Sequence, residues 1–488
     1  MNNRLFNQIV AAAFLCVTLC ACKPKARDGQ GFGQRAANPA HAALPADTKP
    51  TAPATAAADT APVRDEVGFR QRVASYGNAE SDLTIKLDQG FTITKTVGIP
   101  SNAKGATLTI TSEDPKKPAV VLRGFVGEGT DLGHMISVAK GAALLLKDIV
   151  LDGNKAVHQK NLGALVDVGG LLTMSDGTVL RNNQSGNGSA FVRAGGNFTM
   201  MGGKIANNSA YFGGGVGVAV GGRFAMEGGK ISGNTGGQGG GVFVYGEFMM
   251  RDGVISENAA EAYGGAVCVL GGLFTMDGGV IRGNASENYG GGGVLVTEGG
   301  RFNMGRGEID GNKASGGGGV HVEGGRFRMD GGTIRDNTAE NHGGGGVIIG
   351  VGGSFEMCGG VISGNTTSTF GGGVVASRGG SFTMEGGCVS GNEADIGGGV
   401  YIESSRFTMT GGEIRENAAV GYFGGGVSIN KDGLFTMTGG TISGNTAKHD
   451  GGGVFVFESR FTSGDSAVIH DNTAGPIGSR RTNNVVRM

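Results

Sequence analysis

The segment Phe274-Thr-Met-Asp-Gly-Gly-Val-Ile-Arg-Gly-Asn284 recurs along most of the chain, with close copies at Phe327–Asn337, Phe382–Asn392 and Phe435–Asn445. The Asn that ends each copy returns at intervals of 24 to 28 residues. These Asn residues are Asn154, Asn182, Asn208, Asn234, Asn258, Asn284, Asn312, Asn337, Asn365, Asn392, Asn417, Asn445 and Asn472. Self-similarity at such a period is the signature of a repeat architecture.

The residues inside one repeat indicate short strands joined by tight corners. Phe274 and Met276 are two positions apart, so on a strand both side chains face the same side. Gly278-Gly279 then allows the chain to turn, and Asn284 stands where a second turn is expected. Another apolar alternation, such as Val294-Leu-Val296, precedes each copy and follows a Gly-rich corner.

Three short strands and three corners in about 26–27 residues predict one coil of a parallel β-helix. We therefore expect an all-β fold, a single right-handed β-helix, because parallel crossover connections are almost always right-handed. Equivalent residues of successive coils would then stack in columns. The expected structural Asn ladder runs through Asn208, Asn234, Asn258, Asn284, Asn312, Asn337, Asn365, Asn392, Asn417 and Asn445.

The chain outside the regular repeats (151–475) divides into distinct segments. Residues 67–150 are expected to hold irregular first coils and a short helix, since Phe69, Val73 and Tyr76 follow helical spacing. Such a helix can cover the open end of a β-helix. Residues 476–488 are predicted to be a C-terminal tail, in which Pro476 stops further strand addition.

The first 66 residues are predicted to be an export signal and a tether. Ile9–Leu19 is an apolar run too short to span a bilayer, so residues 1–21 fit a signal peptide. Leu19-Cys20-Ala21-Cys22 resembles the lipobox of bacterial lipoproteins. That resemblance implies that Cys22 carries the lipid, such as palmitate, and anchors the chain in the membrane. Residues 22–66 are rich in Ala, Pro and Thr and are expected to form a disordered tether.

Composition excludes several partner and cofactor classes. A formal net charge of −1 gives no nucleic-acid footprint. The histidines stand singly along the chain, so we expect no metal site, and no cofactor motif is found. Cys268, Cys358 and Cys388 lie in positions that disfavour bridging and are predicted to be free thiols.

The repeats resemble those of bacterial surface β-helix proteins, including repeat-rich adhesins and, more distantly, the chlamydial polymorphic outer-membrane proteins. Gly264-Gly-Ala-Val267 matches a motif of the latter, but no Phe is followed by Asn three residues on. The fold also resembles pectate-lyase-like β-helices. The resemblance implies a surface location and an adhesive function. The function is inferred only by analogy, because proteins with the same fold can have different functions.

The pectate-lyase-like superfold also hosts polysaccharide lyases and hydrolases, which are the alternative function. Polygalacturonase-type enzymes carry Asn-Thr-Asp, Asp-Asp, Gly-His-Gly and Arg-Ile-Lys, and none of these occurs in the chain. Acid–base glycosidic chemistry needs paired carboxylates. At the position directly after the inner Met of each repeat, such as Asp277 after Met276, Asp or Glu never occurs in two adjacent coils. We therefore expect no catalytic residues.

Aromatic residues gather in the variable corner that precedes the Gly run: Tyr211, Phe212, Tyr263, Tyr289, Phe370, Tyr422 and Phe423. One interpretation is that each ring folds over its turn and stacks on its neighbours. The other is a row of exposed rings suited to binding protein or glycan. The sequence leaves both open.

These observations predict a lipid-anchored protein of the bacterial outer membrane, facing the cell surface. We expect a non-catalytic adhesin or binding protein for host or envelope macromolecules. Its partners would be the membrane, through Cys22, and a host protein, matrix component or glycan.

Substitution Cys22→Ala should abolish lipid attachment, because the only acylation site expected from the motif is then missing. Metabolic labelling with radioactive palmitate measures this directly. The wild-type chain should be labelled and the variant should not. Label of equal intensity in the variant would refute the assignment of Cys22.

Overall fold

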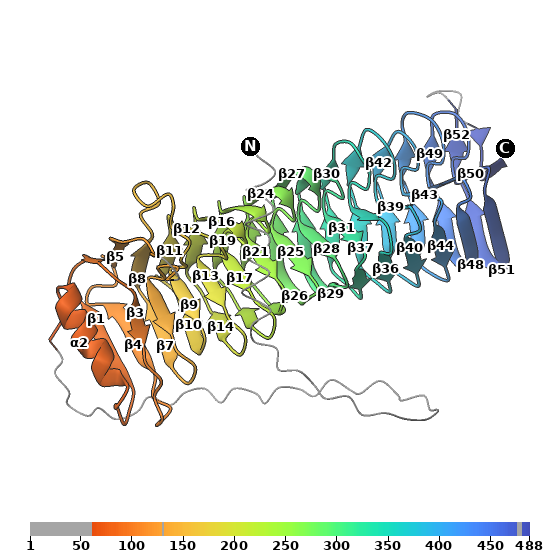
Figure 1. Ribbon diagram of the computed structural model, residues 1–488. Helices are drawn as coiled ribbons and strands as arrows, with labels where there is room; N and C mark the ends of the chain where they lie inside the picture. The colour runs from red at the N-terminus through yellow and green to blue at the C-terminus, as the bar shows by residue number, and fades with distance from the viewer. Residues whose placement is uncertain (1–60, 129–130, 476–480) are drawn as a thin grey trace, which may run out of the picture. The chain divides into compact units, whose positions relative to one another are not determined.

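The computed structural model describes residues 61–128, 131–475 and 481–488. These residues form a right-handed parallel β-solenoid of about 15 turns with one short helix, as the sequence predicted (Figure 1). The predicted lipidation site Cys22, the predicted signal peptide and most of the predicted tether lie outside the described residues.

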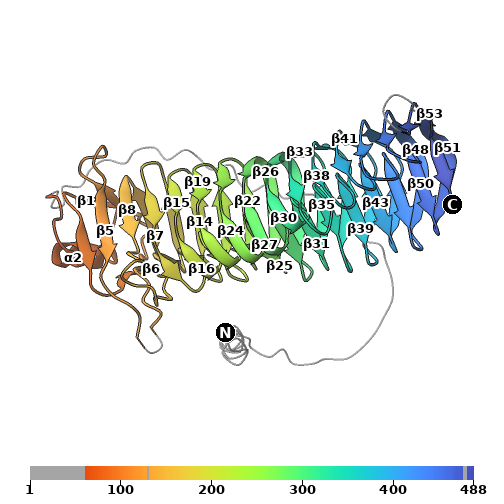
Figure 2. The same ribbon diagram turned by 90° about the horizontal axis from the view of Figure 1, so that it is seen from above.

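Three sheets run side by side along the solenoid, and every coil from β12 (Gln184–Ser185) onward contributes to all three, whereas the earlier coils contribute to two (Figures 1 and 2). Sheet A has 26 strands, sheet B has 15 and sheet C has 13. One representative coil passes from β25 (Val267–Leu270) in sheet B to β26 (Leu273–Arg282) in sheet A and β27 (Ala285–Gly290) in sheet C. It then enters the next coil at β28 (Val294–Thr297). In most coils the sheet A segment is divided into two strands, as in β22 (Glu247–Met250) and β23 (Val254–Ser256).

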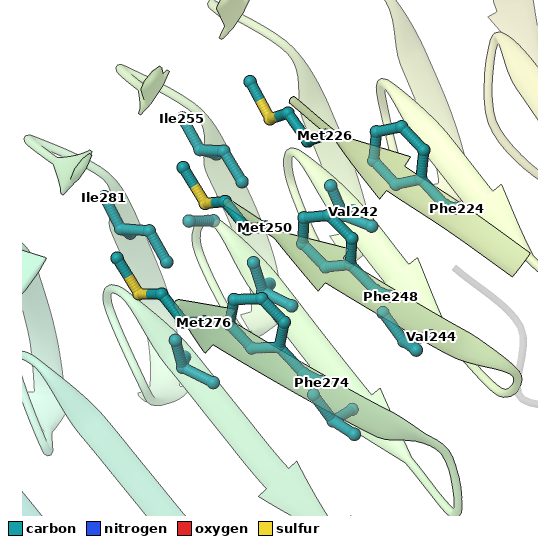
Figure 3. Close-up of a cluster of buried hydrophobic side chains, with 14 of the residues drawn as sticks. Phe224, Met226, Val242, Val244, Phe248, Met250, Ile255, Phe274, Met276 and Ile281 are labelled. Carbon is teal, nitrogen blue, oxygen red and sulfur yellow. The ribbon is translucent and has the colours of Figure 1, made fainter. Parts of the chain in front are cut away.

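Equivalent residues of neighbouring coils pair in register and align in interior columns. Phe248 pairs with Phe274, which pairs with Phe302 of β29 (Arg301–Asp310). From Phe198 to Phe461 the rings stack with centroids 4.4 to 5.0 Å apart. Figure 3 shows three coils of this core, with the Met and Ile columns beside the Phe column. The predicted interior columns of Phe, Met and Ile or Val are therefore confirmed.

From Gly203 to Gly440, the last glycine of the bend after each inner Met is required by the packing of the Met column. Gly279 has φ +77°, a left-handed backbone conformation that residues other than glycine rarely adopt. A Cβ there would also lie 2.4 Å from the Cε methyl of Met250 in the preceding coil. The bend can thus hold a methionine terminus only if it lacks a side chain.

Buried asparagines form a continuous hydrogen-bonded ladder between coils. The Asn284 backbone N–H donates to Asn312 Oδ1 at 3.0 Å, and Asn284 Nδ2 donates to the same oxygen at 2.9 Å. Asn284 Nδ2 also donates to the Ile255 carbonyl at 3.0 Å. The same pattern repeats from Asn208 to Asn472, and all of these side chains are buried.

The two ends of the ladder differ from the sequence-based assignment. Asn183, not Asn182, is the buried residue that donates its N–H to Asn208 Oδ1, while Asn182 has φ +53° at the turn. Asn154 is a turn residue of the same kind, with φ +49°. Arg123 Nη2 donates to Asn183 Oδ1 at 3.3 Å, and at the other end Asn472 donates to Asn484 Oδ1 at 3.2 Å.

A helix covers the N-terminal end of the solenoid, as expected. Helix α2 (Glu66–Tyr76) buries Phe69, Val73 and Tyr76 against the first coils (Figure 1). The Tyr76 hydroxyl donates to the Ala106 carbonyl at 2.8 Å. Val63 pairs with Leu87, so the last residues of the segment assigned to the tether belong to the fold.

The strands of the first coils are β1 (Leu83–Leu87), β2 (Phe91–Ile93), β3 (Val97–Ile99), β4 (Leu108–Ser112), β5 (Ala119–Arg123), β6 (Ile136–Val138), β7 (Ala143–Lys147) and β8 (Ile149–Asp152). At the opposite end the expectation for Pro476 was wrong. After it, β54 (Val485–Arg487) pairs with β50 (Val454–Phe457), and β53 (Arg481–Thr482) pairs antiparallel with β52 (Thr473–Ala474).

Substitution Asn337→Ala should lower the free energy of unfolding by roughly 1–3 kcal/mol, the cost of leaving buried polar groups unpaired. The change removes the acceptor of Asn312 and the donor of the Ile309 carbonyl. Urea denaturation measures the loss. Asn341→Ala in the same coil is the control, because Asn341 is exposed and should change stability little. Equal stability of the two variants would contradict a structural role for the ladder.

Candidate functional site

The aromatic corner lies where the chain passes from sheet C to sheet B. The ring residues of this corner (Tyr211, Phe212, Tyr263, Tyr289, Phe370, Tyr422 and Phe423) are called the corner band below. Tyr263, for example, ends β24 (Ala259–Tyr263), immediately before a Gly-rich turn. Because the coils are in register, rings at this position in neighbouring coils come together: Tyr263 and Tyr289 stack with centroids 4.7 Å apart.

Part of the corner band folds over the outer face of sheet B. Most sheet B strands have two inward Val or Ile residues and one residue between them that faces outward. In β21 (Val242–Val244) and the next two strands of sheet B, β25 and β28, the middle residues are Phe243, Cys268 and Leu295, in that order. All three are buried. Phe212 and Tyr263 pack against them. Further along, Phe423 stacks on Phe455 with centroids 4.4 Å apart. These rings contribute to a second apolar layer outside the solenoid.

The remaining rings of the corner band reach solvent. Tyr289 is 54% exposed and Tyr422 is 50% exposed, while Tyr211 and Phe370 are 39% and 38% exposed. Each also rests on another ring: Tyr211 contacts Phe212 edge-on at 4.5 Å, and Phe370 stacks on Tyr401 at 4.7 Å. The corner band therefore divides into packed rings and exposed rings, with stacking over the turn in one part and exposure in the other.

The apolar middle residue of the sheet B strands is a signal that the sequence analysis did not use. An outward strand position that holds Phe, Cys, Leu, Ile or Val over consecutive coils indicates a covered face. His321 occupies this column between Leu295 and Ile348. Its ring is largely buried, with 18% of the side chain exposed, and burial together with nearby His342 lowers the pKa of His321 to about 4.

One group of potential metal ligands lies together among the described residues: Glu356, Cys358 and Glu385, within 4.8 Å of one another. Glu356 is already paired with Arg328 Nη1 at 2.6 Å. Burial and the flanking carboxylates raise the pKa of the Cys358 thiol to about 12, so it is protonated at neutral pH. The two glutamates form a carboxylate pair on adjacent coils. The sequence analysis compared only the position directly after the inner Met, which holds Glu385, whereas Glu356 lies between the inner Phe355 and Met357. All three side chains are at least partly exposed, and the Cys358 thiol donates hydrogen bonds to Glu356 and Glu385.

A second polar cluster covers the first coils. Asp167 is buried and accepts from Arg193 Nε at 2.5 Å and from Ser137 Oγ at 3.2 Å. His134 Nδ1 accepts from the Ala164 N–H at 3.0 Å, and burial lowers the pKa of His134. Ser, His and Asp thus lie near one another, but the serine donates to the aspartate. A nucleophile–base pair would require the serine hydroxyl to donate to the histidine.

The three cysteines of the repeats are free thiols, as predicted. Cys268 is completely buried in the layer outside sheet B, and burial raises the pKa of its thiol above the usual range. Cys358 and Cys388 are partly exposed.

Comparison with known proteins identifies no relative. No family model matches the chain, and neither a curated protein nor a solved structure matches it significantly. No helix in the described part of the chain has the length and hydropathy needed to span a bilayer.

Stability should fall with acid through the protonation of His321. The pKa of the folded state is below that of the unfolded chain, so the contribution is complete above about pH 6.5 and is lost as pH falls toward about 4. We expect His321→Leu to remove part of this loss, on the order of 2 kcal/mol at pH 4.5, in urea denaturation. His449→Leu is the control, because its ring is exposed. A stability difference between wild type and His321→Leu that does not depend on pH would contradict this prediction.

Proposed function

We propose that the chain is a lipid-anchored, non-catalytic binding protein of the bacterial cell surface, acting as an adhesin for a host or envelope macromolecule. The observation that carries this proposal is the corner band, in which exposed rings recur on one edge of the solenoid. The lipobox-like segment that ends at Cys22 supports the anchor and the outer-membrane location.

The exposed rings have properties that favour binding. An aromatic side chain offers a large contact area and loses little conformational entropy when bound, and Tyr adds a hydroxyl for hydrogen bonding. Tyr289 and Tyr422 are each supported from below, Tyr289 by Tyr263 and Tyr422 by Phe423 and His449. Rings held in this way are preorganised, so binding costs less ordering.

Repetition adds a second favourable property. Equivalent positions are separated by the strand spacing, about 4.8 Å per coil, so the corner band presents several contacts along one direction. A macromolecule with its own repeated surface could engage more than one of them at once, and several weak contacts then give a stronger combined interaction. This favours an extended partner over a small molecule.

The chemistry of the other clusters supports a function without catalysis. A general acid of a glycosidase needs a raised pKa, usually from burial. Glu356 and Glu385 lie on an open face, and Glu356 is held by Arg328. In the Asp167 cluster the carboxylate is paired with Arg193, and Ser137 donates to that carboxylate rather than to a histidine.

Replacing Tyr289 and Tyr422 by Ser should weaken adhesion by roughly tenfold, because rings at a binding hot spot each contribute through their buried area. Both rings are half exposed, so the melting temperature should change little. Adhesion of bacteria that display the protein to host cells or matrix protein measures the first effect, and thermal unfolding measures the second.

The matched control is Phe212→Ser, which removes a packed ring of the same corner band. This variant should lower the melting temperature, and its adhesion per folded molecule should fall less than that of the double Tyr variant, because Tyr211 is the exposed ring that Phe212 supports. If the double Tyr variant adheres as well as wild type, the corner band does not bind the partner.

A further inference from the structure

A second surface feature lies at the opposite corner of sheet B, where the chain turns into sheet A. It is a hollow of about 490 Å³. Its side chains are Asn197, Arg223, Tyr245, Glu247, Leu273 and Arg301, and the rest of its lining is glycine.

The hollow exists because one corner is shorter than its neighbours. Val242 and Phe248 are six positions apart, whereas the corresponding residues of the adjacent coils are farther apart, with eight positions from Val216 to Phe224 and seven from Val267 to Phe274. Only Tyr245 and Gly246 connect β21 to β22. Glycines of the longer corners on either side, Gly221 before it and Gly271 and Gly272 after it, line the hollow.

Tyr245 provides an aromatic surface in the hollow. Its side chain is 38% exposed, and its ring packs edge-on against Phe243 with centroids 4.9 Å apart. Phe243 in turn contacts Phe212 at 4.8 Å. The ring is therefore fixed from behind by the apolar layer over sheet B and offers its free surface to solvent.

The charged groups around the ring balance one another. Arg223 Nε pairs with Glu247 Oε2 at 3.1 Å, and both side chains are more than half exposed. Arg301 forms no ion pair among the described residues. Glu298, on the corner two coils beyond Tyr245, is close enough to contribute to the raised pKa of Tyr245, whose main cause is burial. The lining thus holds two arginines and one glutamate, and Glu298 lies near it as a second negative charge. This balance disfavours a polyanion, since binding of nucleic acid or an acidic polymer requires excess positive charge.

The backbone of these corners is already hydrogen-bonded between coils. The Leu273 N–H donates to the Gly246 carbonyl at 2.9 Å, and the Gly246 N–H donates to the Val218 carbonyl at 3.2 Å. A peptide strand that docked by β-sheet addition would need a row of unpaired backbone groups. The hollow instead offers side-chain donors and acceptors around a ring.

We propose that this hollow is a binding site for an uncharged oligosaccharide chain that lies along the solenoid axis. Sugar rings present a C–H face that packs on an aromatic ring, and their hydroxyl groups both donate and accept hydrogen bonds. Guanidinium, carboxylate and amide groups supply the complementary acceptors and donors. The column Asn197, Arg223, Glu247, Leu273 and Arg301 is in register over five coils, roughly 19 Å at the strand spacing. That length suits a chain of several sugars.

The proposed sugar site depends on the proposed adhesive function in one respect, that the solenoid serves as a binding surface. The site is on a different corner from the corner band and has its own ligand class. Its test therefore uses purified full-length protein and defined sugars rather than cell adhesion.

Isothermal titration with cellohexaose, maltohexaose and chitohexaose tests the proposal, with hexagalacturonate as the charged probe. At least one neutral probe should bind, and Tyr245→Ala should weaken that binding by roughly tenfold. Arg301→Ala should also weaken it, and this exposed substitution leaves the fold intact. Phe457→Ser is the matched control, since it removes an exposed ring at the end of β50 that belongs to neither site, and this variant should bind the sugar as wild type does.

Three outcomes would overturn the proposal: no binding of any neutral probe, binding of hexagalacturonate alone, or neutral-probe binding that Tyr245→Ala and Arg301→Ala both leave unchanged. A melting temperature measured for each variant separates lost binding from lost folding. Reduced adhesion of the double Tyr variant with unchanged sugar binding would locate the two activities on separate corners.

Discussion

The buried ladder of asparagine amides is the interaction on which the rest of the solenoid depends. Each amide is removed from water, which is tolerable only when both adjacent coils supply partners at the correct height. Within the ladder every Oδ1 accepts from the preceding coil, so all the amide dipoles point the same way. Their negative ends face Arg123, a fully buried guanidinium that donates to Asn183 Oδ1 and to the Ala164 carbonyl. Burial lowers the pKa of Arg123 to about 10, and the aligned dipoles and carbonyls provide the compensation that a carboxylate would otherwise give.

A fixed height per coil has consequences for every other column. Once Asn284 is in register with Asn312, the Phe, Met and Ile positions of the two coils are also in register. Identical side chains then stack at the strand spacing, which suits flat rings and unbranched Met. The glycine bend that receives each Met terminus follows from the same geometry. Variation in length is left to the corners, because they lie outside the columns.

The outer face of sheet B shows how this scaffold creates surface chemistry. Its middle column carries apolar residues, and the rings of the corner band cover them on one side. Packed rings such as Phe212 and Phe423 hold the exposed rings in place. The short corner at Tyr245 adds a hollow at the other edge of the same sheet. Both features combine a rigid repeat with a local departure from it, as binding sites on regular scaffolds commonly do.

The sequence by itself determined the period, the inward columns, the capping helix at Phe69, Val73 and Tyr76, and the free thiols, because each depends on spacing along the chain. Only the tertiary structure decided which of Asn182 and Asn183 turns inward, since both are adjacent and either suits a turn. It also decided that the tail after Pro476 adds a strand, and that Tyr263 is packed while Tyr289 is exposed. These outcomes depend on contacts with other coils about 26 residues away. A local pattern specifies which way a strand residue faces, but its exposure depends on what the rest of the chain places over it.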